Sequence, residues 1–166
     1  KNNPSKLSLD YACEYMIDES LIEKADNKKL ITIGDKYVLL EMSYLSEPIN
    51  LNEILFQIQT NGYIPIIAHP ERYRFWFEKF KKFIKLKDRG CLFQLNLLSS
   101  IGYYGKDIAK FCDKLLKNNM IDFTGTDIHN INQSNLFLDI NDISAKTVIK
   151  EHKKLKSLMS NNSIFL

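Results

Sequence analysis

The feature that most constrains the fold is a strand–helix unit that recurs about every 27 to 30 residues from residue 37 onward. The predicted strands cover residues 7–15, 37–41, 64–68, 91–96 and 120–124, and the predicted helices cover 51–60, 75–89 and 106–118. The strands are almost continuously apolar, which is typical of parallel strands buried on both faces. The pattern therefore predicts an α/β fold with right-handed crossovers, built as either a barrel or an open sheet.

Local signals support the helix boundaries. Asn50 and Glu53 have the spacing of a capping box at the start of the helix that follows residue 50. Gly62 and Gly90 lie where helices are expected to end. Residues 144–160 form a basic amphipathic pattern, and we expect this helix to pack against the rest of the fold.

Composition excludes several classes of protein. A chain of 166 residues fits one domain, and a net charge of +3 is too small to predict a nucleic-acid-binding protein. We expect no membrane insertion, because no apolar run approaches the roughly 20 residues that a spanning helix needs, and we recognise no signal peptide. The three cysteines are then expected to be reduced thiols, two of them buried, in a cytoplasmic protein.

Acidic residues and histidines lie at the ends of four predicted strands. They are Glu14, Glu41, His69, Asp127 and His129. The carboxyl ends of parallel strands meet at one edge, where α/β proteins place their active sites. Carboxylates and imidazoles together suit Mn, Fe or Zn. Glu14 and Glu41 have apolar neighbours, so each needs a cation nearby, either a metal ion or a Lys or Arg side chain. We therefore predict a metal site formed by these five residues.

Three neighbouring features allow more than one interpretation. Arg72 could bind a phosphate group on the metal ions, or it could form a surface salt bridge with Glu71. The aromatic residues of 73–77 could line a pocket for a phenyl ring, or they could form the packed start of the next helix. His152 lies in the basic C-terminal segment, and we predict that it is not a ligand.

Other catalytic mechanisms lack their motifs. Cys13, Cys91 and Cys112 are not followed six residues later by an arginine, as a cysteine-based tyrosine phosphatase requires. The sequence contains neither a G-x-x-x-x-G-K-[ST] loop nor a G-x-G-x-x-G fingerprint. The segment Gly125–Asp127 lacks the serine of a nucleophile elbow.

Four motifs resemble a known family. They are Ile-Ala-His-Pro-Glu-Arg-Tyr at 67–73, Leu-Glu-Met-Ser at 40–43, Gly-Cys-Leu-Phe-Gln-Leu-Asn at 90–96 and Thr-Asp-Ile-His at 126–129. They are similar to motifs of the PHP-superfamily, manganese-dependent tyrosine-protein phosphatases of the CpsB/CapC/YwqE type. The likeness extends from about residue 7 to about residue 131.

The resemblance implies a distorted, TIM-like (β/α) barrel of the PHP type with a multinuclear Mn²⁺ site, Fe and Zn being alternatives. It implies hydrolysis of phosphotyrosine on a bacterial tyrosine kinase that controls capsule and exopolysaccharide synthesis. By motif, the metal ligands would be Glu14, Glu41, His69, Asp127 and His129, and Arg72 would bind phosphate. Arg72, Asp127 and His129 are the catalytic residues that the resemblance suggests. Water activated by the metal ions would attack phosphorus.

The family also has an H-x-H motif on its first strand, which this sequence does not contain. Its histidines are His69, His129 and His152. We therefore expect residues 1–166 to form a single partial PHP domain whose N-terminal strands are missing, and to be weakly active or inactive alone. Turnover of a phosphotyrosine substrate by purified 1–166 with Mn²⁺, lost in Asp127→Ala, would refute this expectation.

Two alternative functions remain open on the sequence. The barrel could hydrolyse another phosphomonoester, such as histidinol phosphate or a nucleic-acid end, although the small net charge disfavours the nucleic acid. It could instead be a non-catalytic barrel that binds a kinase tail through residues 73–77 and 103–104. Metal content would separate these possibilities, and the sequence does not predict the oligomeric state.

Overall fold

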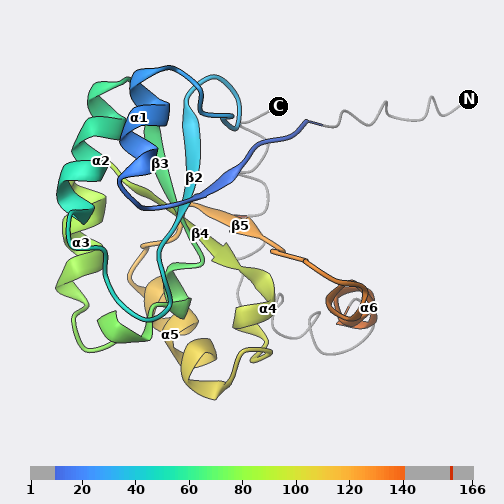
Figure 1. Cartoon of the computed structure of the whole chain (residues 1–166). Coiled ribbons are helices and arrows are strands. Elements are labelled where there is room, and N and C mark those ends of the chain that lie inside the picture. The colour runs from blue at the N-terminus through green and yellow to red at the C-terminus, as the bar shows by residue number, and fades with distance from the viewer. Residues whose placement is uncertain (1–9, 141–157, 159–166) are drawn as a thin grey trace, which may run out of the picture.

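The computed structural model describes residues 10–140 and Leu158, and its elements alternate between strands and helices (Figure 1). The strands are β1 (Glu14–Met16), β2 (Tyr37–Glu41), β3 (Ile64–Ala68), β4 (Leu92–Asn96) and β5 (Phe123–Gly125). The α-helices are α1 (Ser20–Asp26), α2 (Leu51–Thr60), α3 (Lys81–Asp88), α4 (Leu97–Ser100), α5 (Lys106–Lys117) and α6 (Ile131–Ile140). Two 3₁₀ turns, η1 (Pro70–Arg72) and η2 (Arg74–Trp76), connect β3 to α3.

The five strands form one parallel sheet in the order β1-β2-β3-β4-β5. The predicted α/β class is therefore confirmed. Within the described residues the sheet is open, with β1 and β5 at its two edges. Consecutive strands that lie side by side differ from a doubly wound sheet, in which the strand order reverses at a switch point.

Strand register determines which residues share a face of the sheet. Glu14 is opposite Leu39, which is opposite Ile66. Side chains alternate between faces, so Glu41, two residues beyond Leu39, lies on the same face as Glu14. On β4 and β5, Gln94 is opposite Phe123, and the same face continues to Asn96 and Gly125. We call this the site face.

The opposite face is covered by helices. Figure 1 shows α1, α2 and α3 stacked along one side of the sheet. Val38 and Leu40 of β2 and Phe93 and Leu95 of β4 point into this core and are completely buried. On the site face, Leu39 and Glu41 of β2 and Leu92 and Gln94 of β4 are only partly buried, whereas Ile66 and Ala68 of β3 and Asn96 of β4 are buried. The expectation of strands covered on both faces is therefore met by most of β3, and on β2 and β4 mainly by the face opposite the site face.

The sequence predicted the central elements well. The strands at 37–41 and 64–68 were predicted with their observed bounds, and α5 ends one residue before the predicted bound. The expected helix at 75–89 begins only at Lys81, because the preceding segment forms the 3₁₀ turns η1 and η2. The helices α1, α4 and α6 were not predicted.

Two N-terminal predictions need correction. The strand expected at 7–15 is β1 at Glu14–Met16, so Glu14 begins the strand rather than ending it. The capping box at Asn50 is also not formed: Asn50 is the N-cap residue of α2, but its side chain donates to Glu19 Oε1 at 3.3 Å. The predicted helix at 144–160 lies outside the described residues except Leu158, which is helical and buried.

The described helices give no indication of a membrane span, since the longest of them, α5, has 12 residues. A spanning helix needs about 20 apolar residues.

The loop between β2 and α2 is attached to the body of the protein by Glu47. Its carboxylate accepts hydrogen bonds from the Trp76 indole N–H at 2.9 Å and from Lys82 Nζ at 2.7 Å. Burial would raise the pKa of the Glu47 carboxyl, but these two donors and the Lys82 charge lower it below its usual value. The ionised carboxylate therefore stabilises the folded loop.

We expect Glu47→Gln to lower the free energy of unfolding by about 1 kcal/mol at pH 7, since a hydrogen-bonded ion pair is lost. The pKa of Glu47 is lower in the folded protein than in the unfolded chain. Its contribution to the free energy of unfolding is therefore fully present above the unfolded-state pKa, and it is lost as the pH falls through the folded-state pKa. The difference between wild type and variant in urea denaturation should therefore shrink below about pH 4. Glu78→Gln, at an exposed carboxylate, is the control. An equal loss of stability in both variants, or one independent of pH, would contradict this role.

Candidate metal centre

Three predicted ligands converge at the carboxyl edge of the sheet. His69 Nε2 lies 3.2 Å from Glu14 Oε1 and 3.5 Å from Glu41 Oε2. One ligand atom from each of these residues lies within 4.8 Å of the other two. We call Glu14, Glu41 and His69 the ligand trio.

The backbone brings these side chains together. Glu14 and Glu41 share the site face through the register of β1 and β2. His69 follows β3, and its backbone N–H donates to the carbonyl of Gln94 at 2.8 Å, which extends the ladder by one residue. Its φ of 34° lies in the left-handed region, which costs a non-glycine residue about 1 kcal/mol or more. This turn directs the buried imidazole toward the two carboxylates.

The charges of the trio fit a cation. Burial and the neighbouring Glu14 charge raise the pKa of the Glu41 carboxyl. His69 Nε2 faces both carboxylates and also lies 3.4 Å from the Tyr44 hydroxyl. A single ring nitrogen donates at most one hydrogen, so it cannot satisfy both acceptors. A divalent cation held by the two carboxylates and the imidazole would compensate the charge, and the donor set suits Mn, Fe or Zn.

Asp127 is the centre of a second group of contacts. Its Oδ2 accepts from Arg72 Nη1 at 2.8 Å and from Asn96 Nδ2 at 3.0 Å, and its Oδ1 lies 2.7 Å from His129 Nε2. Asp127 also has a left-handed backbone, with φ of 49°. These contacts fix the carboxylate beside the trio.

A cavity of about 150 Å³ connects the two groups. Its lining includes two members of the trio and also Asp127. The residues are Glu14, Leu39, Ala68, His69, Gln94, Asn96, Gly125 and Asp127. The absence of a side chain at Gly125 leaves room for the Gln94 side chain of the neighbouring strand, because a Cβ at Gly125 would lie 2.8 Å from Gln94 Oε1. The volume and the polar lining of the cavity suit a small polar ligand at the strand ends.

The five predicted ligands are only partly brought together. Glu14, Glu41 and His69 form a cluster, and Asp127 lines the same cavity. His129 lies outside the trio and contacts Asp127, with 71% of its side chain exposed. The Asp-x-His segment thus turns both side chains toward each other.

The contacts of residues 69–77 exclude one interpretation of Arg72, and its phosphate-binding role stays a prediction. Arg72 pairs with Asp127 and not with Glu71, so the surface salt bridge was wrong. Glu71 is fully buried, and its Oε1 accepts from the Asn96 backbone N–H at 3.1 Å. Burial raises the pKa of the Glu71 carboxyl. Tyr73 and Trp76 are buried in the core, so these aromatics are packing residues and do not line an accessible phenyl pocket.

Sequence reasoning did not connect three residues to this site. Asn96 links β4 to Asp127 and also caps α4, since its Oδ1 accepts from the Leu98 N–H at 2.9 Å. The rings of Tyr44 and Tyr104 both lie within 4.5 Å of Arg72 Cζ. Asn96 could have been found as a polar residue ending a predicted apolar strand. Tyr44 was not singled out, and Tyr104 was named only as part of a possible kinase-tail-binding region.

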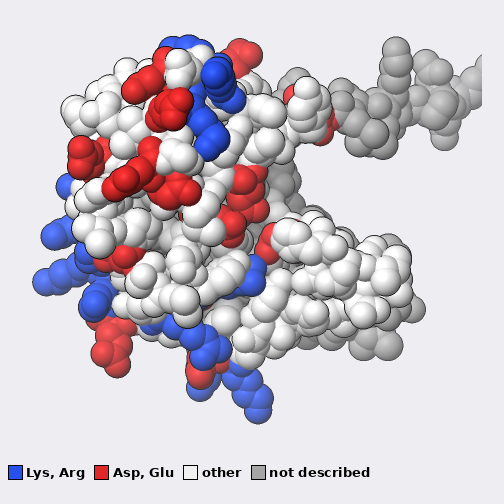
Figure 2. All heavy atoms as spheres, viewed as in Figure 1, with Lys and Arg blue, Asp and Glu red and all other residues white. Residues whose placement is uncertain are grey.

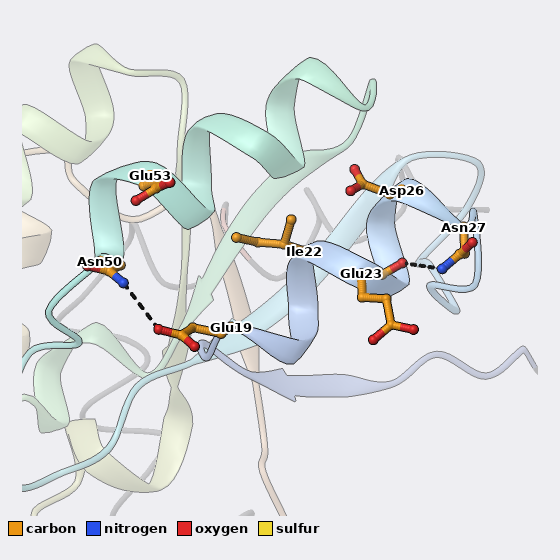
Figure 3. Close-up of a pocket in the computed structure, with 7 residues that line it drawn as sticks. All are labelled: Glu19, Ile22, Glu23, Asp26, Asn27, Asn50 and Glu53. Atoms are coloured by element: carbon orange, nitrogen blue, oxygen red, sulfur yellow. Dashed lines mark hydrogen bonds between the residues drawn. The ribbon is translucent and has the colours of Figure 1, made fainter.

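A second cavity of about 480 Å³ lies between α1 and α2 (Figure 3). Figure 2 shows acidic side chains gathered over these helices. The lining contains four carboxylates but neither histidine nor arginine, and one carboxylate, that of Glu19, accepts from Asn50. It is on the helical side of the sheet, away from the carboxyl edge where the trio lies. We therefore do not assign the chemistry to it.

Comparison with known proteins agrees with the resemblance seen in the motifs. The family model "Capsular polysaccharide synthesis, CpsB/CapC" matches residues 1–164. CapC of Staphylococcus aureus is 31% identical over 163 residues, covering 96% of this chain and 63% of that protein. The tyrosine-protein phosphatase YwqE of Bacillus subtilis is 33% identical over 109 residues, covering 65% of this chain and 43% of YwqE.

A solved structure is also similar. It belongs to a study of YwqE from Bacillus subtilis and CpsB from Streptococcus pneumoniae, described as metal-dependent tyrosine phosphatases. The match has a TM-score of 0.67 and 25% identity, and it covers 90% of this chain and 64% of the solved chain. The chain thus spans less than two thirds of the length of these relatives.

We expect Asn96→Ala to lower the free energy of unfolding by about 1 to 3 kcal/mol, because it removes a helix cap and leaves the buried Leu98 N–H without its acceptor. Asn118→Ala is the matched control, since Asn118 is exposed and, within the described residues, its side chain donates to the Lys114 carbonyl one helical turn away. We expect the control to change stability by less than about 0.5 kcal/mol. Equal losses in urea denaturation would contradict the role of Asn96.

Proposed function

This chain belongs to the CpsB/CapC family of capsular polysaccharide synthesis proteins, and on that premise we propose that its protein is a metal-dependent phosphatase acting on protein phosphotyrosine. The observation that supports this most is the convergence of Glu14, Glu41 and His69 at the carboxyl edge of a parallel sheet. Its named relatives YwqE and CpsB are tyrosine-protein phosphatases.

We propose Glu14, Glu41, His69, Asp127 and His129 as metal ligands, with Mn²⁺ as the metal and Fe or Zn as alternatives. The trio offers three of the donors, and Asp127 borders the same cavity. When bound, such a metal supplies an activated water and neutralises charge on the phosphoryl group.

The protein's own groups would orient the phosphate ester. Arg72 contacts Asp127, which lines the cavity, and two tyrosine rings, and its guanidinium fork can donate hydrogen bonds to two phosphate oxygens. Its charge would stabilise the transferring phosphoryl group. Asp127 holds Arg72 Nη1 at 2.8 Å, which orients the fork relative to the trio.

We also propose that the five-stranded sheet is part of a TIM-like (β/α) barrel of the PHP type. Its support is the sequential order of parallel strands and the single face that is lined by half-buried, partly polar residues. A bacterial tyrosine kinase of capsule or exopolysaccharide synthesis is the proposed partner. The proposed location is the cytoplasm, supported by the three free thiols of Cys13, Cys91 and Cys112.

The competing functions receive less support. A phosphatase for a different phosphomonoester is not favoured by relatives that are named tyrosine-protein phosphatases. The non-catalytic binder would use residues 73–77 and 103–104, yet Tyr73 and Trp76 are buried in the core and, of the aromatics in these two segments, Tyr103 is the one that is exposed.

The test is hydrolysis of a phosphotyrosine peptide by the full-length protein, with its metal content measured by mass spectrometry. We expect Mn²⁺-dependent turnover, and we expect His69→Ala to lower both bound metal and kcat/KM, the latter by about 100-fold or more.

His152→Ala is the matched control, because the sequence predicts that His152 is not a ligand. It should retain metal and activity. Turnover that survives removal of metal by a chelator, or a His69→Ala protein with normal metal content, would overturn the proposal.

A further inference from the structure

The Arg72 guanidinium lies close to two aromatic rings. Its Cζ is 4.5 Å from the centroid of the Tyr44 ring and 4.2 Å from the centroid of the Tyr104 ring. Tyr44 comes from the loop after β2, and Tyr104 comes from the loop before α5. Cation–π contacts at such distances stabilise a partly desolvated guanidinium.

Tyr44 is held in place although nearly half of it is exposed. Its ring stacks on that of Tyr73 with centroids 6.3 Å apart. The buried Tyr73 hydroxyl accepts from the Met42 N–H at 2.9 Å, and Glu47 attaches the other end of the loop to Trp76. The loop is thus attached on both sides of Tyr44.

Tyr104 is held by a series of contacts that leads back to Arg72. Its hydroxyl accepts from Gln133 Nε2 at 3.3 Å, and Gln133 Oε1 accepts from the His129 N–H at 2.7 Å. His129 contacts Asp127, which accepts from Arg72, and Arg72 packs on Tyr104. These contacts therefore connect Tyr104 and Arg72 to the segment that contains the Asp-x-His motif.

The phenol side chain of tyrosine is neutral at pH 7. The contacts of Tyr44 and Tyr104 with Arg72 are therefore cation–π contacts and not ion pairs.

The contacts of Arg72 leave several of its donors for a ligand. Its Cζ lies within 4.5 Å of both ring centroids, and among the described residues the guanidinium donates a hydrogen bond from Nη1 to Asp127. The other N–H groups of the guanidinium are donors for an oxyanion, and two of them in one plane have the geometry of bidentate binding.

We propose that Tyr44 and Tyr104 are positioning residues that clamp Arg72 so that its other N–H groups bind the phosphoryl group of the substrate. This inference rests on the proposed phosphatase function for the identity of the ligand. It assigns the binding of phosphate to the fork and the positioning of the fork to the two rings.

The test compares Tyr44→Ala and Tyr104→Ala with Tyr44→Phe and Tyr104→Phe in the full-length, Mn²⁺-loaded protein. The dissociation constant of inorganic phosphate is measured by calorimetry, and KM and kcat are measured with a phosphotyrosine peptide. We expect each alanine variant to weaken phosphate binding and raise KM by about 3- to 30-fold, with a smaller change in kcat. The phenylalanine variants keep the ring beside Arg72 and lose the hydroxyl contacts with His69 and Gln133, so they should weaken phosphate binding less than the alanine variants. Tyr11→Ala, which removes an exposed ring outside the clamp, is the control.

A double-mutant cycle separates positioning from general damage. In an Arg72→Ala background, Tyr104→Ala should change phosphate affinity no further, because the ring acts through Arg72. Equal effects of Tyr104→Ala with and without Arg72, unchanged affinity in both alanine variants, or no binding of phosphate by the wild type would each overturn the clamp.

The same measurements separate the clamp from the proposed function. If the wild type binds phosphate through the clamp but hydrolyses no phosphotyrosine, the proposed function fails and the clamp stands. If it hydrolyses the peptide and the alanine variants match it, the clamp fails and the function stands.

Discussion

The structure depends on two carboxylates placed on the same face of a parallel sheet, at the edge where an imidazole faces both. Glu14 and Glu41 share that face through the register of β1 and β2, and His69 turns into it immediately after β3. Burial of the Glu41 carboxyl and, after it, repulsion by the Glu14 charge raise the pKa of Glu41. The same repulsion makes the position favourable for a cation. Burying these charged groups without a partner would be costly, and they lie instead beside the cavity at the strand ends.

Asp127 connects the carboxylates of Glu14 and Glu41 to the rest of the site. Its carboxylate contacts Arg72, Asn96 and His129, which come from three separate segments. Asn96 in turn binds Glu71 through its backbone and caps α4. Arg72, the buried Glu71 beside it and the Asp-x-His segment are therefore one network, so a change at one member should affect the others.

Much of this arrangement could be predicted from the sequence. The strand bounds of β2 and β3 were evident because short apolar runs end in Glu41 and His69, and parallel strands place such residues at one edge. The start of α3 could not be predicted, since its helical pattern continues upstream into residues that form 3₁₀ turns to bury Tyr73 and Trp76. The position of Glu14 at the start of β1 depends on how β1 pairs with β2, and the strand propensity of residues 7–15 does not predict that pairing. The Arg72 clamp depends on loops that meet only in the folded protein.

The most direct test of the central claim is anomalous diffraction from a crystal of the protein grown with Mn²⁺. The account predicts an anomalous peak between Glu14, Glu41 and His69, with the carboxylate oxygens and Nε2 about 2.0 to 2.3 Å from it. Density without a peak at this position, and with a lysine or arginine side chain between the two carboxylates, would contradict it.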